Sequence, residues 1–193
     1  SIVTVKKLET IGAKQIEPVA KNRTMICFGD SVTPCYDAIH PSLSYPALLG
    51  SLLAADEINK GIGGDLFFPA LLEEAECPDP DYITVAYGSN DWCKSTPEEF
   101  EANCRGFLSR IAKLYPTSNI FILAPIWHSK FDTVSKLGRT GSEQDAWMRA
   151  ICRDYPTLHY VDGSLLTPNR QEFFTDTAGH PTETCFAAYA AKL

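Results

Sequence analysis

Four short blocks of residues in this chain are of the types that perform acyl transfer. They are Gly29-Asp30-Ser31, Gly63-Gly64-Asp65, Gly88-Ser89-Asn90-Asp91, and Asp176 followed by His180-Pro181. A serine hydroxyl becomes a nucleophile when a neighbouring base removes its proton, and the base works best when a third group orients it. Ser31, His180 and Asp176 are candidates for these three roles. The resulting oxyanion needs preorganised donors. The N–H groups of Ser31 and Gly64 and the side-chain amide of Asn90 are suitable donors.

The segments that must position these residues alternate between strand and helix patterns. Strand patterns cover residues 24–28, 57–59, 82–86, 119–124 and 158–161. Helix patterns cover 44–55, 66–75, 96–114, 142–155 and 182–193. Strands that alternate with helices imply right-handed crossovers and a parallel sheet covered on both faces. The sequence therefore predicts an α/β fold, a three-layer α/β/α sandwich with a mainly parallel five-stranded sheet.

Two of the reactive blocks follow directly on strong strand patterns. Ser31 comes just after the apolar run 25–28, and Asn90 comes after the strand at 82–86, beyond an expected turn at Gly88. In open α/β sheets, ligands bind outside the carboxyl ends of the strands. Both residues should therefore lie at one edge of the sheet. The long irregular stretch 128–141 is expected to be functional and to form a lid, because such loops are uncommon in compact domains.

Composition excludes several other classes of protein. The 193 residues are 45% hydrophobic, which suits one compact domain, and the formal net charge of −7 makes nucleic acid an unsuitable partner. No apolar stretch approaches the roughly 20 residues of a membrane helix. Because the chain begins at Ser1, we expect a processed or trimmed product. Residues 1–22 are interpreted as an N-terminal arm, an edge strand or a remnant of an upstream domain, and residues 23–193 as the catalytic domain.

The seven cysteines are widely spaced and contain no C-x-x-C pair, so neither a disulfide framework nor a zinc site is indicated. Cys27, Cys104 and Cys185 lie in apolar segments and are expected to act as small core hydrophobes. Reduced cysteines favour a reducing, cytoplasmic compartment, although a removed signal peptide would change that expectation.

The four blocks together resemble the signature blocks of the SGNH, or GDSL-type, hydrolases. The resemblance extends over about residues 24–193 and implies a flavodoxin-like SGNH hydrolase fold. It implies Ser31 as nucleophile and first oxyanion donor, and His180 as general base. It also implies Gly64 and Asn90 as the other oxyanion donors. Members of the family usually place the supporting aspartate three residues before the histidine, where this chain has Thr177, so the role of Asp176 depends on a one-residue bulge.

Each of these residues also has a structural alternative. Ser31 suits an N-cap or turn, and Asn90 suits an Asx-turn at a strand end. Asp30 is interpreted as a turn-forming acceptor rather than a catalyst. Trp92, Trp127 and His128 follow strand ends and could bind substrate, with core packing as the alternative. The other histidines lack metal-ligand spacing.

A dinucleotide site is rejected for the glycine-rich segment 61–65, because Leu66 occupies the position of the third fingerprint glycine. The segment 29–36 also suits phosphate poorly, since it contains Asp30 and Pro34. A flavodoxin-like domain that binds FMN is therefore disfavoured.

The resulting hypothesis is a serine esterase that works through an acyl-enzyme, without a metal or organic cofactor. Its expected partner is a small-molecule or carbohydrate ester, with a small acyl group such as acetyl on a sugar-like alcohol. The family resemblance also allows a lysophospholipase or thioesterase. A non-catalytic glycan-binding module on the same fold is the alternative from another class. Oligomeric state is left open.

Overall fold

The computed structural model describes residues 6–7, 9–12, 14–15, 17, 19–75, 77 and 79–193. Its centre is a five-stranded sheet with the order β2-β1-β3-β4-β5, in which every pair of neighbouring strands is parallel. The strands are β1 (Arg23–Gly29), β2 (Ala55–Gly61), β3 (Tyr82–Ala86), β4 (Asn119–Leu123) and β5 (Leu158–Val161). The predicted α/β fold with a parallel sheet is confirmed.

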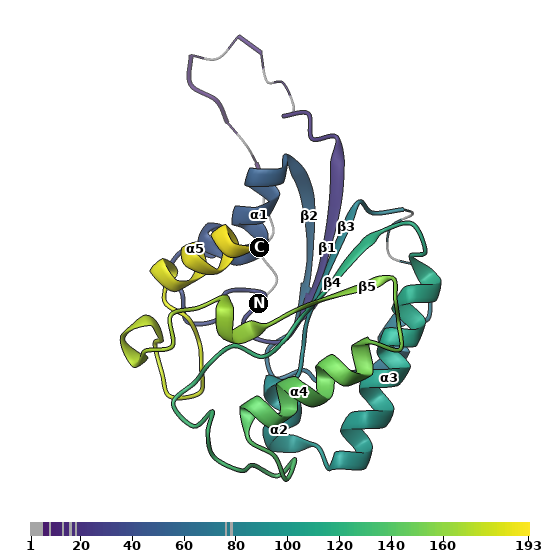
Figure 1. The fold of residues 1–193 in the computed structure, drawn as a ribbon. Coiled ribbons are helices and arrows are strands. Elements are labelled where there is room, and N and C mark those ends of the chain that lie inside the picture. The colour runs from purple at the N-terminus through teal and green to yellow at the C-terminus, as the bar shows by residue number, and fades with distance from the viewer. Residues whose placement is uncertain are drawn as a thin grey trace.

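Helices cover both faces of this sheet (Figure 1). α1 (Tyr45–Leu53) and α5 (Glu183–Lys192) lie on one face, and α3 (Pro97–Leu114) and α4 (Gly141–Cys152) lie on the other. The short helix α2 (Ser89–Lys94) follows β3. Four 3-10 turns complete the regular structure: η1 (Pro41–Leu43), η2 (Pro69–Leu72), η3 (Gly163–Leu165) and η4 (Gln171–Phe173).

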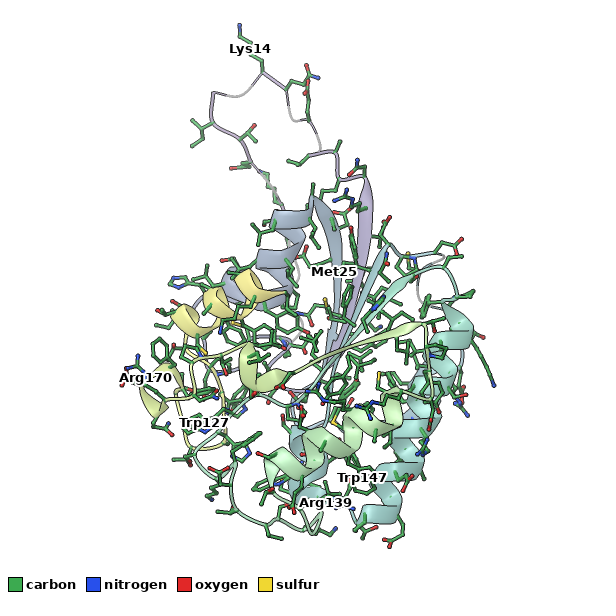
Figure 2. All side chains as sticks on the ribbon, viewed as in Figure 1. Lys14, Met25, Trp127, Arg139, Trp147 and Arg170 are labelled. Carbon is green, nitrogen blue, oxygen red and sulfur yellow. The ribbon has the colours of Figure 1, made fainter. Side chains whose placement is uncertain are left out.

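Side chains of β1 alternate between the two cores that this layering creates. Ile26 and Phe28 belong to the core with α3 and α4, while Met25 and Cys27 belong to the core with α1 and α5. Met25 lies inside the molecule in Figure 2. Because all four side chains are at most 1% exposed, β1 is buried on both faces, as expected for a central parallel strand. The strand therefore holds the loop that starts at Asp30 in a rigid place.

The helix predicted at 66–75 is wrong. This segment is largely irregular and contains only the 3-10 turn η2. The physical reason is Pro69, because a proline ring disfavours helical backbone at the residue before it. Phe68 accordingly has an extended backbone, with φ −128° and ψ 93°.

Two further predictions need correction near the site. The turn predicted after Gly88 is instead the short helix α2, so Asn90 and Trp92 are helical residues. The strand predicted at 57–59 is longer, because β2 pairs with the whole of β1 from Ala55 to Gly61. Arg23↔Ala55 and Gly29↔Gly61 are the first and last pairs of that register.

The N-terminal arm is only partly described. The edge strand is predicted from the apolar residues Ile2, Val3, Val5 and Leu8, which alternate with polar ones, and these four residues lie outside the described part of the chain. Lys14 stands away from the body of the molecule (Figure 2).

Cys27, Cys104 and Cys185 have free thiols and are buried, as expected. In the described part of the chain, no helix combines the length and apolar character needed to cross a membrane.

Candidate active site

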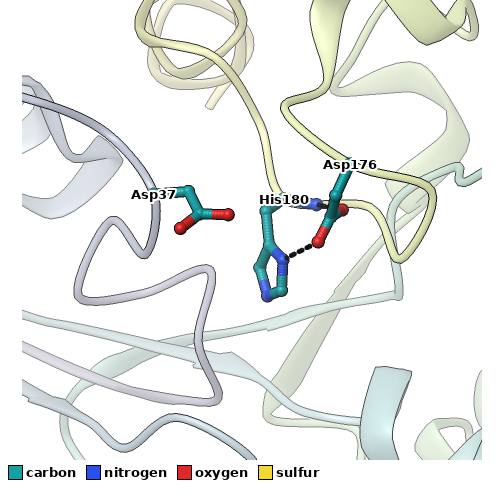
Figure 3. A group of neighbouring side chains, drawn as sticks. All are labelled: Asp37, Asp176 and His180. Carbon is teal, nitrogen blue, oxygen red and sulfur yellow. Dashed lines mark hydrogen bonds and ion pairs between the residues drawn. The ribbon is translucent and has the colours of Figure 1, made fainter.

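Three side chains from two distant parts of the chain form a continuous hydrogen-bonded row. Ser31 follows β1, and its Oγ lies 2.8 Å from Nε2 of His180. Nδ1 of the same imidazole lies 2.6 Å from Oδ2 of Asp176 (Figure 3). Because an ionised carboxylate only accepts hydrogen bonds, Nδ1 carries the proton and donates it to Asp176. The lone pair of Nε2 therefore faces the Ser31 hydroxyl.

The turn 176–180 absorbs the extra residue between Asp176 and His180. Oδ1 of Asp176 accepts backbone N–H bonds from Ala178, Gly179 and His180, at 2.9, 3.0 and 3.1 Å. Gly179 has a φ of +100°, a conformation that favours glycine. The one-residue bulge considered above is therefore present. Partial burial opposes ionisation, but the bonds from the His180 ring and backbone leave the pKa of Asp176 below its usual value.

A cavity of about 240 Å³ opens beside this row. Ser31, Asn90 and His180 line it together with Val32, Ser89, Trp92, Cys93, Ile126, His128, Lys130, Thr177, Ala178 and Gly179. Trp92 and His128, which were candidates for substrate binding, are thus at the cavity. Trp127 is not among the lining residues. It packs instead against Phe174, with ring centroids 5.3 Å apart. For Trp127, the structure therefore agrees with core packing rather than with substrate binding.

Gly64, the third candidate oxyanion donor, lies near Ser31 but is not among the residues that line the cavity. A Cβ built on its neighbour Gly63 would be 3.9 Å from Cβ of Ser31, so this loop passes beside the serine. Gly64 has a φ of +85°, and its carbonyl accepts a 2.8 Å bond from Nζ of Lys94. The Lys94 contact orients this peptide segment next to the serine.

Two buried aspartates support the loops that carry Ser31 and Asn90. Oδ1 of Asp30 accepts the Val32 N–H at 3.1 Å, which agrees with its interpretation as a turn-forming acceptor. Asp91 accepts the Phe67 N–H at 3.4 Å and the Ser95 hydroxyl at 3.3 Å. Burial raises the pKa of Asp30 to about 6 and that of Asp91 to about 7.

The loop after Ser31 brings two further residues to His180 that sequence reasoning missed. The Tyr36 ring lies 4.6 Å from the imidazole, measured between centroids. Asp37 turns its carboxylate toward the histidine (Figure 3), and single atoms of Asp37, Asp176 and His180 all lie within 4.8 Å of one another. Asp37 has a φ of 65° without being glycine. No sequence pattern predicts this backbone conformation of the loop.

Residues of these types can bind a metal ion, but their contacts argue against that use here. A histidine ligand must offer a ring nitrogen with a free lone pair. In His180, Nδ1 is bonded to Asp176 and Nε2 to Ser31, so neither nitrogen is available. The arrangement suits proton transfer between Ser31 and His180 better than metal binding.

The predicted lid segment 128–141 lies only partly at the cavity, and two other histidines lie outside it. The segment 128–141 contributes His128 and Lys130 to the lining. Farther along, the Leu137 N–H donates to the Trp92 carbonyl at 3.2 Å, which ties the segment to α2. His40 pairs with Glu183 at 2.9 Å, and His159 packs against Phe121. Neither histidine belongs to the site.

Comparison with solved structures shows the same fold in several proteins. A protein from Lactobacillus plantarum superposes with a TM-score of 0.74 and 20% identity, over 88% of this chain and 93% of that one. A salicylyl-acyltransferase from a tetracycline biosynthetic pathway superposes with a TM-score of 0.75 and 20% identity, over 91% of this chain and 54% of that one. A protein from Bacteroides ovatus, described as a GDSL-like lipase, superposes with a TM-score of 0.69 and 17% identity, over 88% of this chain and 51% of that one.

No match to a curated protein was found for this sequence. The family model described as GDSL-like lipase/acylhydrolase matches residues 27–187, which include Ser31, Asn90 and His180. That match covers most of the chain and agrees with the parallel sheet and with the four sequence blocks. The chain belongs to the GDSL-like lipase/acylhydrolase family.

Proposed function

We propose that this member of an ester hydrolase family cleaves a carboxylic ester through an acyl-enzyme on Ser31. The observation that carries the proposal is the unbroken row from Ser31 through His180 to Asp176, with contacts of 2.8 and 2.6 Å. Family membership supports an ester hydrolase in general terms. The row supports the choice of nucleophile and base.

In the acylation step, the Ser31 hydroxyl attacks the ester carbonyl carbon while Nε2 of His180 takes its proton. The hydrogen bond from Nδ1 to Asp176 stabilises the imidazolium that forms. Nε2–H then protonates the alkoxide of the leaving alcohol as the carbon–oxygen bond breaks. The products of this step are the free alcohol and an acyl ester of Ser31.

Water completes the cycle. His180 removes a proton from water, the hydroxide attacks the acyl carbonyl, and the Ser31 oxygen leaves with the proton returned by His180. In both steps the carbonyl oxygen becomes negative and needs donors. We assign that role to the N–H of Ser31 and the side chain of Asn90, two residues that line the cavity, and to the Gly64 N–H in the adjacent loop.

The acyl group in this proposal is small, such as acetyl, and the alcohol is sugar-like. A cavity of about 240 Å³ holds a small acyl group and one ring, and it offers less room for a long aliphatic chain. Trp92 and His128 are half-buried in its lining and can stack against a sugar face. A long-chain lysophospholipid or thioester would need a longer apolar groove.

The first test is labelling with a fluorophosphonate, which modifies only an activated serine. We expect labelling of the wild type at Ser31 and loss of labelling in Ser31→Ala and His180→Ala. Cys93→Ser is a matched control, because Cys93 also lines the cavity but has no part in the row. An unlabelled wild-type protein would favour the glycan-binding alternative and overturn the proposal.

The second test measures kcat/KM for p-nitrophenyl esters of increasing acyl length. We expect the acetyl ester to be the best substrate and the rate to fall with each added carbon pair. Ser31→Ala serves as the background. A rate that rises with acyl length would refute the small-acyl part of the proposal while leaving the serine mechanism intact.

A further inference from the structure

One wall of the cavity carries a positive charge that forms no ion pair with any residue that the structure describes. Lys130 lines the cavity, and in the described part of the chain its ammonium group makes no ion pair. None of the described residues that line the cavity is acidic. This is unexpected for a chain with a formal net charge of −7. The cavity therefore differs in charge from the molecule that surrounds it.

His128 adds an oriented hydrogen-bond donor to the same lining. Its Nδ1 accepts the backbone N–H of Lys130 at 3.3 Å, so in the neutral ring the proton is on Nε2. Burial and the nearby Lys130 charge lower the pKa of His128 against the opposing charge of Asp132, which favours the neutral ring. Trp92 and Phe131 contact the ring edge-on, at centroid distances of 4.8 and 5.7 Å, and restrict its orientation.

The backbone around His128 leaves this arrangement little freedom. A Cβ built on Gly179 would lie 3.0 Å from Cβ of His128, so the turn that carries His180 packs closely against the segment that carries His128. The cationic wall and the catalytic row are thereby held next to each other. A substrate with its carbonyl at Ser31 can place a second group against Lys130.

We infer that this cavity binds an ester whose alcohol part carries an anionic oxygen group, a carboxylate or a phosphate, paired with Lys130 and accepting a hydrogen bond from Nε2–H of His128. The inference rests on the proposed function, because it takes the acyl group to be small and the alcohol to fill the rest of the cavity. Charge-assisted hydrogen bonds to an anion are stronger than neutral ones.

Distant acidic residues do not cancel this preference. At physiological ionic strength, charges farther apart than about 8 Å are largely screened. The carboxylates of Asp37 and Asp176 belong to the His180 cluster, and that of Asp132 acts electrostatically on His128. None of these three aspartates lines the cavity. The anionic group of the ligand should therefore be held at Lys130 and away from His180.

Direct binding to Ser31→Ala tests the inference without requiring turnover. The probes are para-acetoxybenzoate and its neutral counterpart of the same shape, para-acetoxybenzamide, with para-acetoxyphenyl phosphate as the phosphate arm. Calorimetry at physiological ionic strength should show binding of an anionic probe about 3- to 10-fold tighter than that of the amide. The better of the two anionic probes identifies the favoured group. Equal affinity for all three probes would overturn the inference.

Variants at the two residues then locate the effect. Adding Lys130→Gln should remove the preference for the anion and change the affinity for the amide by less than about 2-fold. Lys113→Gln, on the far helix α3, is the matched control and should leave the preference unchanged. His128→Phe should weaken anion binding, while His128→Gln, which retains a donor, should restore part of it. A preference that survives Lys130→Gln contradicts the assignment.

Steady-state kinetics of the wild type separate this inference from the proposed function. If the acetyl esters are hydrolysed and the anionic ester has the lower KM, both the esterase proposal and the anionic preference are supported. If the esters are hydrolysed with no difference in KM, only the anionic preference fails. If no ester is hydrolysed while Ser31→Ala still binds the anion through Lys130, the esterase proposal fails and the anion site stands.

Discussion

His180 is hydrogen-bonded at both ring nitrogens and packs against one aromatic ring. Its two nitrogens are bonded to Ser31 and Asp176, and the Tyr36 ring lies 4.6 Å away. Only one tautomer satisfies both nitrogen contacts, since Asp176 must accept and Ser31 must donate. The charge of Asp176 and its position therefore both contribute to the function that we propose for His180.

Asp176→Asn tests that contribution. The amide has almost the same shape but can donate to Nδ1, which favours the tautomer with the proton on Nε2 and removes the base. By comparison with Ser-His-Asp triads, kcat should fall by about 10²- to 10⁴-fold. Ester hydrolysis measured under saturating substrate checks this. Near-normal turnover would eliminate Asp176 as the orienting group.

Asp37→Asn is the matched comparison, because Asp37 is also a carboxylate near the imidazole but makes no hydrogen bond to it in the structure described. An exposed charge at such a distance stabilises an imidazolium weakly, so kcat should fall only about 2- to 5-fold with KM unchanged. The effect should shrink at high salt. A loss as large as that of Asp176→Asn would mean that Asp37 takes part in the row.

Helix α3 illustrates how local signals define an element. Thr96 accepts the Glu99 N–H and Glu99 accepts the Thr96 N–H, which is a complete capping box, and Pro97 is the first helical residue. The same pair of bonds joins Thr140 and Glu143 at the start of α4. Because these contacts join residues within one helical turn, the local sequence is enough to predict them. The segment 66–75 lacked such a cap and contained Pro69, and it did not form the predicted helix.

Thr96→Ala should therefore destabilise the protein without changing its chemistry. Loss of the cap leaves a backbone N–H without its side-chain acceptor, and the free energy of unfolding should fall by about 1 kcal/mol. Urea denaturation measures this change, and ester hydrolysis should keep its kcat/KM. Thr96→Ser retains the hydroxyl and should be close to wild type. A Thr96→Ser variant as unstable as Thr96→Ala would refute the role of the cap.

On the scale of the whole molecule, two aspartates next to residues of the site, Asp30 and Asp91, are buried in the protein interior. Asp30 and Asp91 are at most 1% exposed, and one oxygen of Asp30 has no hydrogen-bond partner among the residues described. Burial raises their pKa values to about 6 and about 7. The folded state therefore binds protons more tightly than the unfolded chain between about pH 4 and 7.

Stability should accordingly decrease as the pH rises through this window. Because the folded pKa values are the higher ones, the contribution is fully present below about pH 4 and is lost above about pH 7. Asp176, Glu99, Glu143 and Glu183 have lowered pKa values and act in the opposite sense, but only at lower pH. Over the whole window, the pKa shift of Asp30 corresponds to about 3 kcal/mol of folding free energy and that of Asp91 to about 4 kcal/mol.

The free energy of unfolding in urea at pH 5 and pH 8 checks this for the wild type and for Asp91→Asn. The wild type should be more stable at pH 5, and Asp91→Asn should show a smaller difference between the two pH values because it cannot ionise. Asp79→Asn, at an exposed turn, is the control. A difference of the same size in Asp91→Asn and the wild type would show that Asp91 does not ionise in this range.

The sequence by itself determined the strands, most of the helices and the four reactive blocks, because hydrophobic period, capping boxes and strand-end glycines are local features. It also indicated Ser31, Asn90 and His180. Only the tertiary structure decided that Asp176 reaches His180 through a turn with one extra residue, and that Trp127 packs away from the cavity. Only the structure placed Asp37 beside the imidazole and Lys130 in the cavity wall. These positions depend on loop backbones and on contacts between segments far apart in the chain, and no local pattern encodes them.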